Sequence, residues 1–279
     1  MIEENTTPTN DRPIILEIGD LCMQFGGLRA VNNFNLTIKP HDLQGLIGPN
    51  GAGKTTVFNM ITGVYLPTAG RIFFLNEEIT GLEPYEINQL GIARTFQNIR
   101  LFQNLTVLDN VRIAYHTHAD YSVMDSILTS RRYGAKEKEL TEKAQEFLSV
   151  FRMEDRQGEI AKNLPYGEQR RLEIARALAA EPKLLLLDEP AAGMNPAESV
   201  QLMDLIHFIR ERFDLTILLI EHQMRVVMGI CETITVMDFG EIIARGTPSE
   251  IQSDPKVIEA YLGPGTAALS EKFRRQKAD

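Results

Sequence analysis

A glycine-rich segment that ends in a lysine and a hydroxyl residue is the clearest candidate for chemistry in this sequence. Residues 48–55, GPNGAGKT, fit the pattern G-x-x-x-x-G-K-[ST], which is typical of loops that bind phosphate groups. Its three glycines allow the backbone to curl so that several N–H groups point inward at an anion. Lys54 brings a positive charge to the outer phosphates, and the hydroxyl of Thr55 can ligate Mg²⁺.

The residues on either side of this loop predict the elements that position it. Residues 43–47 are short and mostly apolar, as in a buried strand, and residues 56–61 have the pattern of an amphipathic helix that begins near Lys54. The positive N-terminal end of that helix would strengthen anion binding. A glycine-rich turn can match the pattern by chance, but a strand before it and a helix after it favour a phosphate site.

A second candidate lies where a run of four leucines, residues 184–187, is followed by Asp188 and Glu189. The run predicts a buried parallel strand, and parallel sheets bind their ligands at the carboxyl ends of the strands. Asp188 can therefore hold Mg²⁺, and Glu189 can orient and deprotonate an attacking water. Two acidic residues can also end a strand at the surface, but a phosphate loop in the same chain favours catalysis.

Composition limits the classes of function. The chain has 279 residues with 29 Lys and Arg against 38 Asp and Glu, a net charge of −9 that argues against a broad nucleic-acid surface. No apolar run approaches the roughly 18 residues of a membrane span. Residues 1–11 lack the pattern of a secretion signal, and the two cysteines suggest neither a disulfide framework nor a metal site. We therefore expect a cytosolic globular protein.

Hydrophobic periodicity predicts the organisation of the chain. We expect a disordered leader at 1–13, a folded region at 14–263 and a polar tail at 264–279. Residues 105–164 are mainly helical in pattern, and the charged run at 136–139 is interpreted as a solvated helix face. Short strands with turns at 14–18, 34–38 and 71–75 predict a small antiparallel layer. Strands at 92–97, 183–187, 216–220 and 234–237, with helices at 168–180, 197–212 and 223–228, predict an α/β fold with a mostly parallel sheet. The helix at 168–180 is expected to have one apolar side and a polar start formed by Glu168, Gln169, Arg170 and Arg171.

Taken in order, five separated motifs resemble those of the ATP-binding subunit of an ABC transporter. They are the phosphate loop, Gln97, residues 164–169 (LPYGEQ), Asp188-Glu189 and His222. The resemblance covers about residues 14–263 and implies a P-loop NTPase core with a mostly parallel sheet, a small antiparallel β layer and an inserted α-helical subdomain at about 98–180. It also implies that the chain hydrolyses ATP with Mg²⁺.

The resemblance assigns roles residue by residue. It implies that Glu189 activates water, that His222 contacts the γ-phosphate, and that Gln97 reaches the Mg²⁺ or the water. The residues implied to hold Mg²⁺ are Thr55, Gln97 and Asp188. The residues implied to contact ATP are Phe25, Gly48, Pro49, Asn50, Gly51, Ala52, Gly53, Lys54, Thr55, Thr56, Leu164, Pro165, Tyr166, Gly167 and Glu168. Without the resemblance, a histidine or glutamine after a strand is more often structural, and an aromatic such as Phe25 more often belongs to the core.

Residues 164–169 depart from the usual signature of the family, Leu-Ser-Gly-Gly-Gln. Tyr166 replaces a glycine, Glu168 replaces the glutamine, and Pro165 replaces the serine and so removes a hydroxyl and an N–H. In the family the signature of one subunit closes over ATP that the other subunit holds. We therefore predict a working but weakened half-site. In the following loop Asn195 replaces the usual acid, and we expect it to hydrogen-bond across the subunit interface without a charge.

Some segments resemble a narrower group, the larger of two ATPase subunits in bacterial branched-chain amino acid importers. They are residues 25–32, 94–97, 119–138, 164–176, 191–196, 246–248 and 255–263. The resemblance implies a second ABC ATPase subunit, with a heterodimer favoured over a homodimer, two integral membrane permease subunits and, indirectly, a substrate-binding protein. It implies a peripheral location on the cytoplasmic face of the inner membrane and no nucleic-acid partner. Urea and amide importers have similar subunits and stay open as an alternative.

Two further classes compete with a transport ATPase. A soluble ABC ATPase that acts on ribosomes or DNA usually has two cassettes or a long coiled-coil insert, whereas this chain has one cassette and an acidic balance. A small-molecule kinase would share the phosphate loop, but the signature segment and His222 argue against it.

Overall fold

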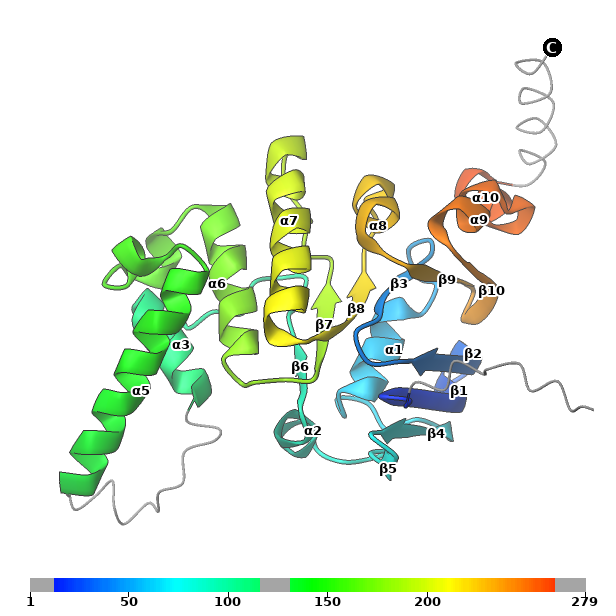
Figure 1. Cartoon of the computed structure of the whole chain (residues 1–279). Helices are drawn as coiled ribbons and strands as arrows, with labels where there is room; N and C mark the ends of the chain where they lie inside the picture. Colours follow the sequence, from blue (N-terminus) through cyan, green and yellow to red (C-terminus); the bar gives the residue numbers. More distant parts are fainter. Residues whose placement is uncertain (1–12, 116–130, 264–279) are drawn as a thin grey trace, which may run out of the picture.

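The computed structural model describes residues 13–115 and 131–263, and these form two sheets with helices around them (Figure 1). The larger sheet has the strand order β10-β9-β3-β8-β7-β6. All neighbouring strands in it are parallel except β9 and β10. Its strands are β3 (Leu43–Ile47), β6 (Ile92–Arg94), β7 (Leu184–Asp188), β8 (Thr216–Ile220), β9 (Thr233–Asp238) and β10 (Glu241–Gly246).

The central strands of this sheet are buried on both faces. Leu185 and Leu187 of β7 lie in one core cluster with residues of α7 (Pro196–Phe213) and α8 (Met224–Ile230). Leu184 and Leu186 lie in the other cluster with residues of α1 (Lys54–Ile61). Successive side chains of a strand point to opposite faces, so a sheet covered on both faces needs uninterrupted apolar runs. The mostly parallel sheet predicted from those runs is confirmed.

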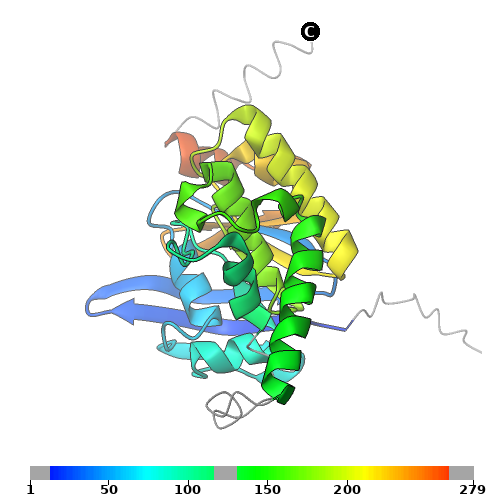
Figure 2. The same ribbon diagram turned by 90° about the vertical axis from the view of Figure 1, so that its left-hand side faces the viewer.

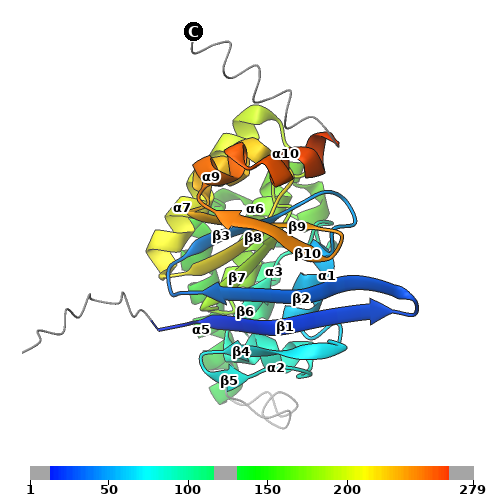
Figure 3. The ribbon, with the colours of Figure 1, turned by 90° about the vertical axis from the view of Figure 1, so that its right-hand side faces the viewer.

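The smaller sheet is antiparallel, with the order β2-β1-β4-β5, and is seen from its outer side in Figure 3. Phe34 and Ile72 of this sheet share a core cluster with Val57 and Phe58 of α1, so this helix fills the space between the two sheets. The predicted small antiparallel layer is confirmed, although its first two strands are longer than expected. The strands are β1 (Leu16–Phe25), β2 (Leu28–Ile38), β4 (Ala69–Phe74) and β5 (Glu77–Glu78).

A group of helices packs at the β6 side of the larger sheet, and Figure 2 shows it from the outside. It contains α3 (Val107–Tyr115), α5 (Arg131–Val150) and α6 (Tyr166–Leu178), with short 3₁₀ turns at Glu154–Arg156 and Ala161–Asn163. Tyr115 of α3 contacts Phe147 of α5 edge to face, with ring centroids 6.0 Å apart. Lys138 and Glu139 of the charged run are exposed, as predicted for a solvated face.

Several boundaries differ from those predicted. The strand expected at 92–97 ends at Arg94, because the chain there leaves the sheet toward the site. The helix expected at 168–180 begins at Tyr166, since Pro165 is its N-cap residue. Short elements with little periodicity were missed, namely α2 (Pro84–Leu90), β10, α9 (Pro248–Ser253) and α10 (Pro255–Leu262). The predicted tail, residues 1–12 of the leader and residues 119–130 of the insert lie outside the described residues.

None of the helices within 13–115 and 131–263 combines the length and the apolarity that crossing a membrane requires.

Candidate active site

The carboxyl ends of four neighbouring parallel strands bring the predicted site residues to one edge of the larger sheet. β3 ends at Ile47, directly before the phosphate loop, and β7 ends at Asp188. Asp188 pairs in register with Ile220, the last residue of β8, and His222 follows two residues later. β6 lies beside β7 and leads to Gln97. The edge predicted from sequence is therefore the edge at which these motifs meet.

The phosphate loop has a backbone that only glycine adopts easily. Gly48, Gly51 and Gly53 have φ angles of +151°, +82° and +101°. A Cβ on Gly48 would collide with the carbonyl oxygen of Met237, and one on Gly53 would lie 2.5 Å from the carbonyl oxygen of Ala30. Glycine is thus required for the curl that turns N–H groups toward an anion.

Lys54 is buried and folded back over its own loop. Its Nζ donates hydrogen bonds to the carbonyl oxygens of Gly48 at 2.8 Å and Pro49 at 2.9 Å. Burial lowers the pKa of Lys54, while the nearby charges of Glu189 and Asp188 act in the opposite direction. The amine is held at the loop with acidic groups close by, where it can meet phosphate oxygens.

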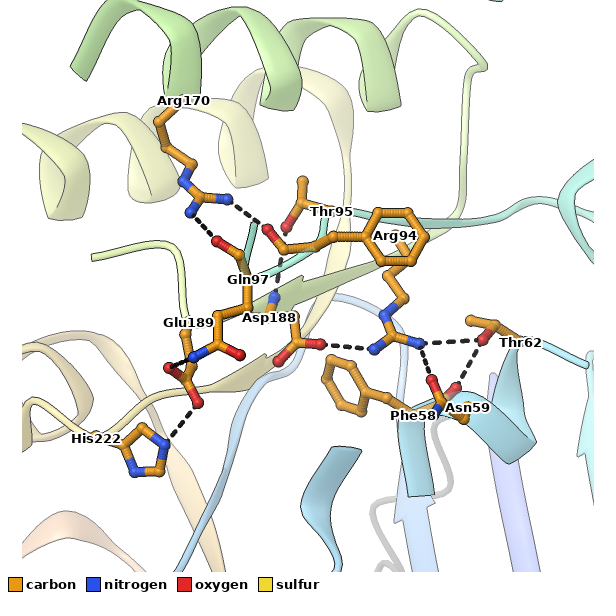
Figure 4. A network of polar contacts seen from close by, with 11 residues as sticks. Phe58, Asn59, Thr62, Arg94, Thr95, Gln97, Arg170, Asp188, Glu189 and His222 are labelled. Atoms are coloured by element: carbon orange, nitrogen blue, oxygen red, sulfur yellow. Dashed lines mark hydrogen bonds and ion pairs between the residues drawn. The ribbon is translucent and has the colours of Figure 1, made fainter. Parts of the chain in front are cut away.

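The carboxylate of Glu189 is held between two of the other predicted catalytic residues (Figure 4). Its Oε1 lies 2.6 Å from His222 Nε2, and its Oε2 accepts a hydrogen bond from Gln97 Nε2 at 2.7 Å. The backbone of Glu189 has a φ of +47°, which is unusual for a residue with a side chain. Strained backbones of this kind cluster at functional sites, and here the turn aims the carboxylate away from the strand.

Glu221, the residue before His222, fixes the loop that carries this histidine. It is buried, and its carboxylate accepts hydrogen bonds from the backbone N–H groups of Ala191 at 2.7 Å and His222 at 2.8 Å. These bonds tie the segment after β8 to the segment after β7. Sequence reasoning did not find Glu221, because a glutamate after a strand carries no signal that it faces backbone donors.

Asp188 has a partner that sequence reasoning also missed. Its Oδ2 accepts a hydrogen bond from Arg94 Nη2 at 2.6 Å, and the other terminal nitrogen of Arg94 reaches Asn59 Oδ1 at 2.7 Å. The Arg94 guanidinium also lies 5.4 Å from the ring centroid of Phe58. This arginine therefore joins the end of β7 to the helix after the phosphate loop. The signal in the sequence that could have identified Arg94 is its position three residues before Gln97.

The loop that carries Gln97 is held from the opposite side by Arg170. The Arg170 guanidinium donates to the carbonyl oxygens of Phe96 at 2.6 Å and Gln97 at 2.7 Å, and it pairs with Glu173 at 2.6 Å. Arg170 was predicted as part of a polar helix start, and its side chain is fully buried in the structure. The carbonyl groups and Glu173 give the buried charge the partners that it requires.

Phe25 ends β1 and is 42% exposed, with its ring edge-to-face with Tyr65 at a centroid distance of 5.4 Å. An aromatic face at this position suits a planar base, and the adenine contact of Phe25 stays a prediction.

The segment 164–168 forms the start of α6. Pro165 is the N-cap residue and gives no side-chain cap hydrogen bond, whereas the carbonyl oxygen of Leu164 accepts from Gln169 Nε2 at 2.8 Å. Glu168 pairs with Arg156, with Oε2 and Nε 3.4 Å apart. Within the described part of the chain, no hydrogen bond joins this segment to the phosphate loop.

The oxygen donors at the sheet edge fit a hard cation better than a zinc-like metal. Thr55 is exposed at the start of α1, and Asp188 ends β7, which Arg94 joins to α1 through Asn59. Among the residues that the structure describes, no three His, Cys, Asp or Glu side chains come together as a metal site. Mg²⁺ commonly binds through one or two protein oxygens together with waters and phosphate oxygens, so the donor set agrees with Mg²⁺ on a nucleotide.

Asn195 caps helix α7. Its Oδ1 accepts hydrogen bonds from the N–H groups of Ala197 at 2.9 Å and Glu198 at 3.0 Å, and Glu198 completes the capping box. The predicted contact of Asn195 with a second subunit is not tested by these bonds, but they occupy its side-chain oxygen.

Comparison with known families gives two matches. Residues 31–192 match the family described as ABC transporter. Residues 241–263, which span β10, α9 and α10, match the family described as branched-chain amino acid ATP-binding cassette transporter.

Curated proteins and solved structures are similar over about nine tenths of this chain. The high-affinity branched-chain amino acid transport ATP-binding protein LivG of Escherichia coli (strain K12) is 45% identical over 249 residues, which is 89% of this chain and 98% of that protein. The corresponding protein BraF of Pseudomonas aeruginosa is 45% identical over 252 residues, 90% of this chain and 98% of its own. A crystal structure of an ATP-binding cassette of an ABC transporter in its ADP conformation matches with a TM-score of 0.78 and 33% identity, over 90% of this chain and 99% of that one.

Proposed function

Because the chain belongs to the ABC transporter family, we propose that it is the ATP-hydrolysing subunit of an importer that takes up branched-chain amino acids through separate permease subunits. The assignment of ATP hydrolysis rests on the position of Glu189. Its carboxylate is held by His222 and Gln97 at the sheet edge where the phosphate loop begins. The substrate class rests on the two relatives that are 45% identical and on the match of residues 241–263.

The phosphate loop and Lys54 bind the β- and γ-phosphates of ATP. The loop offers backbone N–H groups, and helix α1 adds its positive N-terminal end. Lys54 exchanges its bonds to the Gly48 and Pro49 carbonyl oxygens for bonds to phosphate oxygens. Phe25 supplies a ring for the adenine.

Thr55, Gln97 and Asp188 would hold Mg²⁺ on the nucleotide, so ATP and Mg²⁺ are the expected cofactors. When bound, the ion neutralises charge on the phosphate oxygens. Glu189 accepts a proton from the attacking water, while His222 donates a hydrogen bond to the γ-phosphate.

Each ATP site is completed by a second ABC ATPase subunit. The segment 164–168 of one subunit closes over the nucleotide that the other holds, as the resemblance of this segment to the family's signature implies. Pro165 leaves the start of α6 without a side-chain cap. Two different subunits, each with its own signature, are favoured over two copies of this chain.

The permease partners dock on the helical side of the domain. The segment 101–111 leads from the Gln97 loop into α3, and its Phe102 is 46% exposed. An exposed aromatic next to the loop that holds Glu189 suits a cytoplasmic helix of a membrane subunit. We propose that the chain lies peripherally on the cytoplasmic face of the inner membrane, with two permeases and, indirectly, a substrate-binding protein as partners.

We propose that residues 14–263 form the nucleotide-binding domain and that its helical subdomain spans about 98–180. A urea or amide importer is the second candidate for the cargo.

Purification of the tagged full chain from detergent-solubilised membranes of its native host tests the proposal. We expect two integral membrane proteins and a second ATPase to be recovered, and the complex in proteoliposomes to take up radiolabelled leucine with ATP. A complex that carries Glu189→Gln is the control. Uptake of urea and not leucine would change the substrate class, and recovery of ribosomes without membrane proteins would overturn the transport function.

A further inference from the structure

Tyr166 contacts the loop that follows Glu189 in its own chain. Its hydroxyl donates a hydrogen bond to the carbonyl oxygen of Ala192 at 3.0 Å. The edge of its ring lies 3.7 Å from the position that a Cβ on Gly193 would take. Ala192 is itself bonded to the catalytic turn, since its N–H donates to the Glu189 carbonyl oxygen at 3.1 Å. The first residue of α6 therefore holds the backbone three residues beyond the proposed base.

The same hydroxyl is linked to the loop that carries Gln97. Arg170, one helical turn after Tyr166, has a terminal nitrogen 3.4 Å from the Tyr166 hydroxyl and 2.7 Å from the Gln97 carbonyl oxygen. The planar guanidinium has enough donors to serve both acceptors together with Phe96 and Glu173. A line of hydrogen bonds thus runs from the Gln97 backbone through Arg170 and Tyr166 to Ala192.

The chemistry of the phenol suits a position between a cation and a carbonyl. A hydroxyl has one proton and two lone pairs, so it accepts from Arg170 and donates to Ala192 at the same time. A bond accepted from a charged donor polarises the hydroxyl and strengthens the bond that it donates. A phenylalanine would keep the ring next to Gly193 and lose both bonds.

We propose that Tyr166 is a positioning residue for ATP hydrolysis, which sets the loop after Glu189 relative to the loop that carries Gln97. Gln97 and His222 hold the Glu189 carboxylate from two sides, so a shift of either loop changes where the carboxylate points. Tyr166 is 45% exposed, and its phenol acts on Glu189 through the backbone without touching ATP in its own subunit. The inference rests on the geometry of one chain and is independent of the transported cargo.

The variant Tyr166→Phe tests the proposal, with Tyr85→Phe on α2, where the tyrosine is 64% exposed, as the matched control. In hydrogen exchange of the full chain, amides in residues 190–194 should exchange about fivefold faster in Tyr166→Phe, the effect of one lost hydrogen bond. In the complex purified with its partners, kcat for ATP should fall about fivefold while KM stays unchanged, because the phosphate loop is untouched and the aromatic ring stays in the segment 164–168 that closes over the partner's ATP. Tyr85→Phe should match the wild type in both measurements.

Two results would overturn the proposal. Unchanged exchange in residues 190–194 would mean that the phenol does not hold this loop. Faster exchange with unchanged kcat would mean that the contact is only structural. A thermal melt of each variant identifies a global loss of stability, and a second variant, Tyr166→Gln, which keeps hydrogen-bonding groups, should then recover part of kcat relative to Tyr166→Phe. If the complex did not transport leucine, the hydrogen-exchange and ATP-turnover measurements would still test the role of Tyr166, because neither depends on the cargo.

Discussion

The guanidinium of Arg94 lies 2.6 Å from the carboxylate of Asp188, and both side chains are almost fully buried, at 6% and 4% exposure. The pair connects the end of β7 to α1, since Arg94 also bonds Asn59. The charge of the residue expected to hold Mg²⁺ is thus already balanced inside the protein, and the carboxylate is fixed in one orientation.

Replacing Arg94 by methionine should destabilise the protein by about 3–5 kcal/mol, because it leaves the Asp188 charge buried without its partner. Unfolding in urea, followed by circular dichroism, measures this change. Lys138→Met is the control, since Lys138 pairs with Glu142 at the surface with 78% and 61% exposure, and such pairs contribute about 0–1 kcal/mol.

The double variant Arg94→Met, Asp188→Leu separates burial of a lone charge from loss of packing. It should recover much of the stability lost in the single variant, because apolar groups of similar volume replace the pair. If Arg94→Met alone lowered the free energy of unfolding no more than Lys138→Met does, the account of the buried pair would be contradicted.

Glu189→Gln should lower ATP turnover by a factor of about 10²–10⁴ and leave ATP binding intact, because an amide cannot accept the proton of water. Phosphate release by the purified complex gives the rate, and a binding isotherm with ATP gives the affinity. Glu211→Gln, an exposed change on α7, should leave both unchanged. Near-normal turnover would remove Glu189 from the role of base.

Pro165→Ser should raise ATP turnover of the complex. The serine supplies a hydroxyl and an N–H at the start of α6, where proline offers neither. The steady-state rate of phosphate release at saturating ATP measures the change. Pro248→Ser, a substitution at the first residue of α9, is the matched control. Equal rates for Pro165→Ser and the wild type would show that the missing hydroxyl does not limit turnover.

Stability should fall with rising pH between pH 9 and pH 12. Burial raises the pKa of Cys231 from 9.0 to about 12, and it raises the pKa of Tyr115 and Tyr261 from 10.0 to about 12. In this window the unfolded chain has released protons that the folded chain still binds, so the stabilisation present below pH 9 is lost as pH rises.

Urea unfolding at several pH values across this window measures the decline. Cys231→Ala should make the decline shallower, because it removes the thiol whose pKa is raised by burial. A constant free energy of unfolding from pH 9 to pH 12 would contradict the prediction.

The sequence predicted the elements whose signals are local. Strand β8 was predicted with its observed bounds, because the apolar run 217–220 lies between Thr216 and Glu221. The glycines of the phosphate loop were recognised because their spacing in the sequence is what defines the motif. The sheet edge then followed from the rule that parallel strands end together.

The partners of these residues were not predictable in the same way. An arginine is typical of a surface position on a helix. Arg170 is nevertheless buried, because the fold brings the carbonyl groups of Phe96 and Gln97 to its guanidinium. Arg94 and Glu221 likewise face groups that lie far away in the sequence. Helix α2 and strand β10 are too short to show a clear period.

The strand order has a consequence for synthesis of the protein on the ribosome. Leu46, just before the phosphate loop, pairs with Ile220 of β8 and Thr235 of β9, and the Met237 carbonyl closes the space beside Gly48. The loop is translated first, and its supporting strands β8 and β9 emerge only after the helices α3, α5, α6 and α7 have been made. A nascent chain that stops before β8 therefore has the complete phosphate-binding motif and lacks the walls that shape it.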